Sequence, residues 1–576
     1  MRAVTPVGAR RREATGAPPT GRDAPAILAG LTLVLMLAGC GGGDDGAAAT
    51  DGAAGGGDGA PVRSVASAAE PSVPTASVAG ADAEAGDAAG ADGAGAGTGA
   101  GLADGRSSIV ATSPLVDEAL TSRWPAARFG TAGLVPAEPQ RAGDPERGRL
   151  ALVEEGYVAC GLPARVVGEL LAGREVTTYP EREAAARDLP FSMNLSTDAN
   201  GVEIASSNCL TCHGTPLFGE LVVGLGNEFL DFTEDPSLAV ERAGALVRGP
   251  AETQAWERYA DRVQAIAPHM TMRTVGTNPA NNLTFALIAH RDAETAAWSE
   301  EPLLPLPTTE PPPVSVPPWW RMAKKHAMFN LGEGRRDHAR IMMAASMLCT
   351  DSIEELEAID VHAPDIRAYI GSLEPPAWPF GLDAERVARG RGVFETNCSV
   401  CHGRYAVDAE GGRVREEDEY PNRLVPIEVV GSDPTLVEHA YSEAGTAYSD
   451  WFNRSWYGRL STAAPGPGYV APPLDGVWAT GPFLHNGSVP SVRALLDSGT
   501  RPARWAHRGS DASDPENYDE ADLGWRFDAD EDTLSTLAPE RVYDTSRPGH
   551  ANGGHRFGDH LSGEERDAVI EYLKAL

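Results

Sequence analysis

The distribution of apolar side chains divides the chain into three parts. Residues 24–38 form a continuous apolar run after several arginines, and residues 41–112 are almost entirely Gly, Ala, Asp, Ser and Val. The run has the length of a signal-peptide core and is too short for a comfortable membrane span. The Gly/Ala-rich segment carries too few large apolar side chains to offset its conformational entropy. The pattern predicts an export signal at 1–39, a disordered tether at 40–112 and a folded body beyond it.

Within the folded body, four segments combine helical spacing of apolar residues with helix-start signals. In one of them, Asp383 is a plausible N-cap, with Val387 and Phe394 on one face. In the last one, Ser562 and Glu565 have the spacing of a capping box. The four predicted helices are 144–157, 364–373, 383–394 and 561–573. A further helix is expected through residues 340–343, so the fold class is mainly α with long loops and insertions.

Two copies of one short motif carry the chemistry. The sequence C-x-x-C-H occurs at Cys209, Cys212 and His213 and again at Cys398, Cys401 and His402, each time followed by Gly. Two cysteines at this spacing form thioether bonds to the vinyl groups of one porphyrin, and the histidine ligates the iron. A zinc site would need further Cys or His ligands at short spacing. We therefore predict two covalently bound haem c groups.

The motifs and the predicted helices fall into one plan that occurs twice. Each half has a helix before its C-x-x-C-H motif and a closing helix at its end, as in cytochrome c domains. Pro375, Pro376 and Pro379 break the chain after the first closing helix. The sequence thus predicts two cytochrome-c-like haem domains, at 113–376 and 377–576.

The start of the chain bears on its location. Residues 37–40, Leu-Ala-Gly-Cys, resemble the lipobox of bacterial lipoproteins, in which Cys40 becomes the lipid-bearing residue. The alternative is an ordinary export signal with an incidental cysteine. Either signal predicts the periplasm or, with the lipid anchor at Cys40 as the only membrane contact, the outer membrane or its outer surface. In an oxidising compartment, Cys160 and Cys349 could form a disulfide or remain two separate buried thiols.

The net charge of −34 limits the partners. So acidic a surface argues against nucleic acid and against direct binding of anionic lipid. It is compatible with a small basic redox protein or a quinol-linked electron donor, and equally with solubility alone.

The layout resembles the bacterial di-haem cytochrome c peroxidase superfamily and, within it, the rubber-oxygenase-like branch. The likeness covers roughly residues 142–576. It rests on these segments: Pro317–Trp320, Lys324–Phe329, Asp337–Arg340, Tyr420–Asn422, Ala471–Thr480, Leu484–Pro490 and Gly554–Gly558. The resemblance implies that haem one, in the N-terminal half, has a sixth site open to oxygen or peroxide, whereas haem two is six-coordinate and transfers electrons. It leaves calcium between the domains open.

The sixth ligand of haem two has to be a neutral imidazole or a thioether. We choose His555, because it precedes the last helix and matches the Gly-His-x-Phe-Gly pattern of the branch. His550 and His560 are alternatives. His485 is expected at a haem edge or between the domains.

Four residues are candidates for the distal side of haem one: Trp320, His326, Phe329 and His338. An apolar face made by Trp320 and Phe329 would admit oxygen, whereas a distal histidine would protonate the leaving oxygen of peroxide. His326 could instead ligate the iron, and the two tryptophans 319 and 320 could simply be core residues. These options stay open at the level of sequence.

The sequence thus predicts an exported di-haem c-type oxidoreductase that activates oxygen or peroxide at haem one. An apolar unsaturated compound is one substrate class, and hydrogen peroxide reduction of the cytochrome c peroxidase type is an alternative. A second alternative is a non-catalytic electron-transfer cytochrome with both irons six-coordinate.

Overall fold

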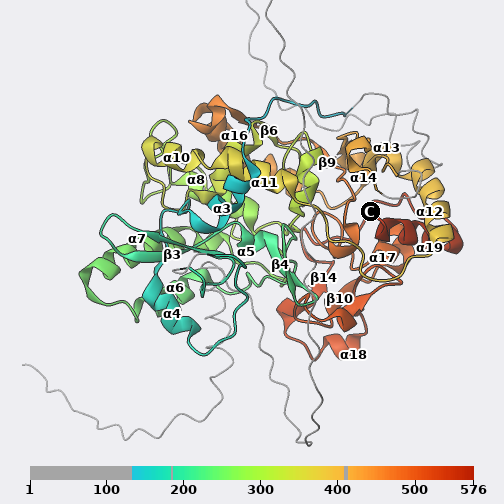
Figure 1. Ribbon diagram of the computed structural model, residues 1–576, viewed down its shortest axis with the longest axis horizontal. Helices are drawn as coiled ribbons and strands as arrows, with labels where there is room; N and C mark the ends of the chain where they lie inside the picture. Colours follow the sequence, from blue (N-terminus) through green and yellow to red (C-terminus); the bar gives the residue numbers. More distant parts are fainter. Residues whose placement is uncertain (1–132, 183–185, 408–412) are drawn as a thin grey trace, which may run out of the picture. The chain divides into compact units, whose positions relative to one another are not determined.

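Two crossed helix pairs organise the computed structural model, which describes residues 133–182, 186–407 and 413–576 (Figure 1). In the first pair, α3 (Pro145–Glu154) packs against α11 (Ala363–Ser372). In the second, α12 (Ala384–Asn397) packs against α19 (Gly563–Lys574). All four predicted helices are confirmed, with ends shifted by one to three residues.

A glycine lies at each crossing because the two backbones come very close there. A Cβ atom on Gly148 would lie 1.9 Å from the carbonyl oxygen of Asp365, and one on Gly390 would lie 1.8 Å from that of Ala568. No side chain fits at either place. The residue one turn further on is fully buried in both helices, as Leu152 in α3 and Phe394 in α12. The two halves thus repeat one packing arrangement.

Local signals start these helices where the sequence indicates. The side chain of Asp383 accepts hydrogen bonds from the N–H groups of Glu385 and Arg386, which satisfies two otherwise unpaired donors of the first turn. Ser562 and Glu565 form the reciprocal capping box at the start of α19.

The other longer helices form the bodies around these crossings. Their bounds are α4 Ala164–Leu171, α6 Pro236–Gly244, α7 Gly249–Ile266, α8 Ala280–Ala289, α9 His338–Met342, α10 Ile353–Asp360, α15 Thr435–Ala440, α16 Glu443–Arg454 and α17 Val492–Leu496. The predicted helix at 340–343 is α9, and it continues as the 3-10 turn η4 (Met343–Ser346). The fold is mainly α, as predicted.

Short strands join segments that are distant in sequence. The antiparallel sets are β1 (Leu162–Pro163), β3 (Glu203–Ser207) and β2 (Met193–Thr197); β4 (Gly214–Leu217) and β5 (Glu220–Val223); β6 (Gly334–Arg336) and β8 (Ser461–Ala463); β7 (Leu424–Pro426) and β9 (Gly468–Val470); β11 (Tyr518–Asp519) and β12 (Gly524–Trp525); and β13 (Phe527–Asp528), β10 (Arg504–His507) and β14 (Tyr543–Asp544). None of these strands has more than five residues, so the sheets connect the helical bodies and do not form a layer of their own.

The two halves of the sequence share one core. The β6–β8 pair crosses from one half to the other, and α16 packs on α8. Aromatic residues of α16, among them Trp451 and Phe452, are buried with Leu152 and Trp319 of the first half. The described residues belong to one compact unit. The domain limits 113–376 and 377–576 stay a prediction.

Cys160 and Cys349 form a disulfide, with their Cα atoms 5.7 Å apart. Of the two alternatives left open by the sequence, pairing is thus the one found. The bond lies in an apolar cluster with residues of α4, α6 and α7, where both cysteines are buried. It ties β1 to the turn that precedes α10.

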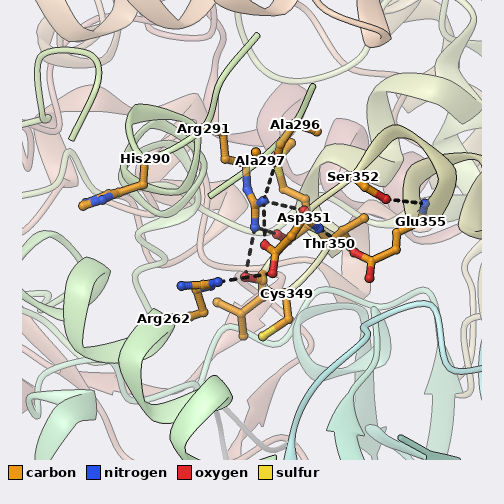
Figure 2. A network of polar contacts seen from close by, with 12 residues as sticks. Arg262, His290, Arg291, Ala296, Ala297, Cys349, Thr350, Asp351, Ser352 and Glu355 are labelled. Carbon is orange, nitrogen blue, oxygen red and sulfur yellow. Dashed lines mark hydrogen bonds and ion pairs between the residues drawn. The ribbon is translucent and has the colours of Figure 1, made fainter. Parts of the chain in front are cut away.

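The buried side chain of Arg291 also contacts the turn at residues 347–351. Figure 2 shows the Arg291 guanidinium directed at Thr350 and Asp351, and it pairs with Asp351 at 3.1 Å. It donates to the Leu348 carbonyl at 3.1 Å. It also donates to the Met347 and Thr350 carbonyls. Arg291 is 1% exposed, so these oxygen acceptors take the place of water around its charge.

The predicted signal at 1–39, Cys40 and the tether at 40–112 lie outside the described residues. Within the part of the chain that the structure describes, no helix has both the length and the apolar character needed to cross a membrane.

Candidate functional site

The first C-x-x-C-H motif lies on a single helical turn, α5 (Leu210–His213), between β3 and β4. The Cys209 N–H donates to the Tyr157 hydroxyl at 3.1 Å, and the Cys212 carbonyl accepts from the Asn227 N–H at 2.9 Å. The His213 carbonyl accepts from the Gly224 N–H at 2.7 Å. These bonds fix the turn on both sides.

The second motif continues directly from α12 into the short helix α13 (Ser399–His402). His402 Nδ1 lies 2.8 Å from the Pro472 carbonyl oxygen, which makes Nδ1 the protonated nitrogen and leaves Nε2 available to a metal. The two thiols of this motif are neutral, because burial raises the pKa of Cys398 to about 12 and that of Cys401 to about 11.

His555 faces His402. The two ring centroids are 6.1 Å apart, and the ring planes are inclined at 57°. Two imidazoles that bind one metal ion through bonds of about 2 Å hold their centroids roughly 6 Å apart. The pair therefore has the spacing that an iron between them requires, and the site fits a haem.

The environment of His555 keeps its imidazole neutral, the state that iron requires. Burial lowers its pKa to about 3, and the neighbouring His402 and Arg501 act in the same direction. Its Nδ1 is buried, with no hydrogen-bond partner in the described part of the chain. The backbone is held as well: the His555 N–H donates to the Val430 carbonyl at 2.7 Å, and Arg501 donates to the His555 carbonyl at 3.1 Å.

The two alternative histidines are engaged elsewhere. His550 lies with Nδ1 2.9 Å from the Pro548 carbonyl oxygen and Nε2 3.2 Å from the Thr274 hydroxyl. His560 lies with Nε2 3.1 Å from the Asn397 side-chain oxygen. His485 stacks on Tyr469 with centroids 4.1 Å apart, and Ser315 N–H donates to its carbonyl, so it lies between the two halves of the chain as expected.

A short 3-10 helix, η3 (Trp319–Lys324), connects the surroundings of the two motifs. The Trp319 ring stacks on His213 with centroids 4.7 Å apart and an interplanar angle of 22°. The Trp320 indole donates to the Asp475 carbonyl at 2.9 Å, three residues after the Pro472 carbonyl that faces His402. Trp320 is 4% exposed and belongs to the core of the second half, with Trp478 and Phe394.

The other predicted distal residues lie in different surroundings. His326 is held by the Val135 carbonyl, 2.9 Å from its Nδ1, and by the Asn422 side chain. Phe329 has a backbone φ of +66° and is 40% exposed, next to Met328 of the first core. His338 is buried, and its Nε2 has no partner among the described residues. The His338 ring also bonds to the backbone of His326, and the distal role of these residues stays a prediction.

One group of charged residues near the motifs was missed in the sequence. Lys324 pairs with Asp475 at 2.7 Å and with Asp418, and Arg413 pairs with Asp418 at 2.9 Å. Arg321 joins this group by donating to the Asp475 backbone carbonyl at 3.1 Å. The adjacent Lys324 and Lys325 were a visible signal, but the acidic partners of Lys324 lie 94 and 151 residues further along the sequence and follow no pattern. In the described residues, no group of three or more His, Cys, Asp and Glu is arranged to hold a metal ion.

Comparison with known proteins bears on the second half. Residues 468–506, from β9 to β10, match the family described as RoxA-like, cytochrome c-like. This stretch is cytochrome c-like. It contains Pro472, whose carbonyl faces His402, and the whole of the segments 471–480 and 484–490, two of those on which the resemblance rests. The match implies covalently bound haem c in this half and supports the likeness to the rubber-oxygenase-like branch. The wider superfamily stays a prediction.

Two similar proteins come from Sinorhizobium fredii, and both are named as uncharacterized. The protein y4iJ is 29% identical over 294 residues, which cover 40% of this chain and 46% of y4iJ. The protein y4iM is 31% identical over 238 residues, which cover 36% of this chain and 52% of y4iM. The chain thus spans about half the length of these relatives, and their names assign no activity.

Proposed function

We propose that the chain is an exported di-haem c-type oxidoreductase in which haem one activates oxygen or peroxide and haem two transfers electrons. Each C-x-x-C-H motif attaches one haem, through Cys209 and Cys212 in the first half and Cys398 and Cys401 in the second. His213 and His402 are the proximal ligands. A haem supplies a redox-active iron whose coordination decides between catalysis and electron transfer.

The observation that carries the proposal is the difference between the groups facing the two proximal histidines. His402 is faced by the neutral imidazole of His555 at the spacing of a bis-histidine pair. His213 instead has an indole stacked on it, and its motif borders an apolar core that includes Leu210, Phe285 and Trp319. This supports a closed iron at the second motif and a site with an apolar surround at the first.

The residues of the chain have separate roles in this proposal. Pro472 orients His402 through Nδ1, and burial keeps His555 neutral. Burial likewise lowers the pKa of His213 to about 4, with the Pro317 carbonyl opposing the shift. The apolar core that borders the first motif would exclude water from that site, and Trp319 and Trp320, adjacent in η3, would lie between the two sites. An apolar unsaturated compound, oxygen and peroxide are the proposed substrate classes.

The electron-transfer cytochrome remains as the second candidate. The continuous path from His213 through Trp319 and Trp320 to the Pro472–Asp475 segment favours it, because electron transfer needs closely packed groups and no open iron. In both candidates we propose export to the periplasm or outer membrane, with Cys40 as lipid anchor, and a small redox protein as electron partner. A calcium ion between the haems would belong to the same proposal.

Haem stoichiometry tests the di-haem part of the proposal. The full chain is produced in a bacterial host that exports it and attaches haem c, and covalent haem per chain is measured by pyridine haemochrome and intact mass. We expect two haems, falling to one in Cys209→Ala/Cys212→Ala and to one in Cys398→Ala/Cys401→Ala. A single haem in the unmodified chain would contradict the proposal. Turnover with peroxide plus a reduced small cytochrome, and oxygen uptake with a polyisoprene, then distinguish the activities.

A further inference from the structure

A small cavity lies between the two halves of the chain. Its volume is about 10 Å³, close to the smallest volume that holds one water molecule. Its lining includes Glu228 and Thr277 of the first half and Trp505, His507 and Tyr543 of the second. The cavity therefore has room for a ligand of the size of water, in contact with side chains of both halves.

Two buried polar atoms of this lining have no hydrogen-bond partner in the described part of the chain, namely Glu228 Oε2 and His507 Nδ1. Other polar side chains of the lining donate to backbone carbonyls: Thr277 Oγ1 at 2.6 Å, Trp505 Nε1 at 3.3 Å and Tyr543 Oη at 2.8 Å. Buried polar groups are nearly always hydrogen-bonded, to protein or to ordered water. The two unpartnered atoms thus indicate a small polar ligand in the cavity.

The local packing holds Glu228 and His507 close together. The ring of Phe229, the residue after Glu228, packs on His507 with centroids 4.9 Å apart. Gly276 lets the backbone of Glu228 approach, because a Cβ atom there would lie 2.4 Å from the Glu228 carbonyl oxygen. Glu228 Oε1 accepts hydrogen bonds from the Ser315 hydroxyl at 2.7 Å and the Val316 N–H at 2.8 Å. The carboxyl group is therefore fixed through one oxygen, and Oε2 remains for the cavity.

The segments that hold Glu228 also hold the first C-x-x-C-H motif. The N–H of Asn227, the residue before Glu228, donates to the Cys212 carbonyl at 2.9 Å. On the other side, Val316 is followed three residues later by Trp319, whose ring stacks on His213. Glu228 is thus connected to the first motif through two short stretches of backbone, without touching His213 in the described structure.

Glu228 and His507 make a donor and an acceptor that one water molecule can bridge. Burial raises the pKa of Glu228 to about 8 and lowers that of His507 to about 4, so a protonated carboxyl faces a neutral imidazole near pH 7. The other titratable or charged groups nearby do not change protonation there. Burial raises the pKa of Tyr543 well above its ordinary value, Arg541 stays positive near His507, and a haem thioether blocks the Cys212 sulfur.

We propose that Glu228, His507 and one bound water molecule form a proton-exchange site linked to the oxidation state of the haem at the first motif. When the iron gains one electron from a small redox protein, Glu228 takes up one proton from solvent. When the iron loses that electron, the proton returns to solvent through the water molecule and His507. An added electron makes the interior more negative, so a nearby acid holds its proton more tightly. His507 is the solvent side of the site, because it is partly exposed whereas Glu228 is 4% exposed.

The test measures reduction potentials of the full haem-loaded chain by spectroelectrochemistry from about pH 6 to about pH 10, a range around the pKa of Glu228. The relevant haem is the one that is lost in Cys209→Ala/Cys212→Ala. Uptake of one proton per electron makes each pH unit a tenfold change in the equilibrium, so the potential should fall by up to about 59 mV per unit. Glu228→Gln keeps the shape of the side chain and should flatten this slope. Glu241→Gln, on the exposed side of α6, is the matched control and should keep it.

Infrared difference spectra, reduced minus oxidised, provide a second readout. The parent should gain a band of a protonated carboxyl group on reduction, and this band should be absent in Glu228→Gln. In His507→Phe the water loses its acceptor, so the carboxyl band should move. An unchanged slope in Glu228→Gln would overturn the proposal, as would the absence of the carboxyl band in the parent. If Glu228→Gln does not fold, the spectrum of the parent decides.

The inference rests on the proposed attachment of a haem at the first motif, but not on its reaction with oxygen or peroxide. An electron carrier would show the same slope and the same carboxyl band. Loss of the proposed enzymatic function and loss of the proton-exchange site are therefore distinguishable, because turnover reports the first and the pH dependence of the potential reports the second.

Discussion

The imidazoles of His402 and His555 face each other with ring centroids 6.1 Å apart, although one follows α12 and the other precedes α19. The crossing of these two helices brings the ends of the second half together, and the Gly390–Ala568 contact fixes how closely they approach. The same packing that closes the fold therefore also sets the spacing of the two proposed iron ligands.

Replacing His555 tests its role directly. In His555→Ala we expect the low-spin signal of one haem to be lost and that haem to bind carbon monoxide when reduced, because a coordination position opens. EPR spectra of the oxidised protein, and optical spectra of the reduced protein with and without carbon monoxide, provide the measurement. His560→Ala is the matched control, since the His560 side chain bonds to Asn397 and does not face His402 in the described structure, and it should keep the parent spectrum. The reverse pattern would assign the ligand to His560.

Replacing either of two glycines in α12 by alanine should change the free energy of unfolding in opposite directions. Gly390→Ala should lower the free energy of unfolding by roughly 1–3 kcal/mol, because the new Cβ meets the Ala568 carbonyl and the helices have to move apart. Gly392→Ala faces open space and should raise it by roughly 0.5–1 kcal/mol through helix propensity. Denaturant unfolding of the holoprotein measures both. Equal effects would show that the crossing is not tight.

The disulfide is expected to stabilise the protein. Cys160→Ser/Cys349→Ser should lose roughly 2–4 kcal/mol, because the bond restricts the unfolded chain over a long loop. Thermal unfolding with and without a reductant checks this prediction. The parent should become less stable on reduction, whereas the double variant should not respond. A parent that is indifferent to reductant would indicate unpaired thiols.

Glu228 should make stability depend on pH. Burial raises its pKa to about 8, while Ser315 and the Val316 N–H donate to its Oε1 at 2.7 and 2.8 Å. The folded state thus binds a proton more tightly than the unfolded state, whose value is near 4.5. This contribution to stability is complete below pH 4.5 and is lost as the pH rises toward 8, at no more than about 1.4 kcal/mol per pH unit.

Glu228→Gln removes the titrating group and keeps the shape of the side chain. Unfolding measured between pH 5 and pH 9 should show a smaller decline in the variant than in the parent. Glu234→Gln is a partly exposed neighbour for comparison and should change the slope less. Parallel curves for parent and Glu228→Gln would contradict the assignment.

The sequence was sufficient where the signal is local. Asp383 and Ser562 cap the helices they were expected to cap, because a cap needs only the next three residues. The two C-x-x-C-H motifs are likewise contiguous. The disulfide needed three-dimensional information, since sequence spacing says nothing about whether two distant Cα atoms lie within bonding range.

Contacts between distant segments were not predictable. The β6–β8 pair consists of two three-residue strands without an alternating pattern, and Lys324 meets Asp418 and Asp475 only after the halves fold together. His326 was one of four residues left open for the distal side of haem one, and its role there stays a prediction. In the structure its ring nitrogen is used by the Val135 carbonyl, a contact that no sequence pattern indicated.

The most direct test of the central claim is the coordination state of the two haems in the purified, haem-loaded chain. Low-temperature EPR as isolated and optical spectra after dithionite, with and without carbon monoxide, measure it. The account predicts one low-spin haem that ignores carbon monoxide and one haem, lost in Cys209→Ala/Cys212→Ala, that binds it. Two low-spin haems unmoved by carbon monoxide would contradict an oxygen- or peroxide-activating site and leave an electron carrier.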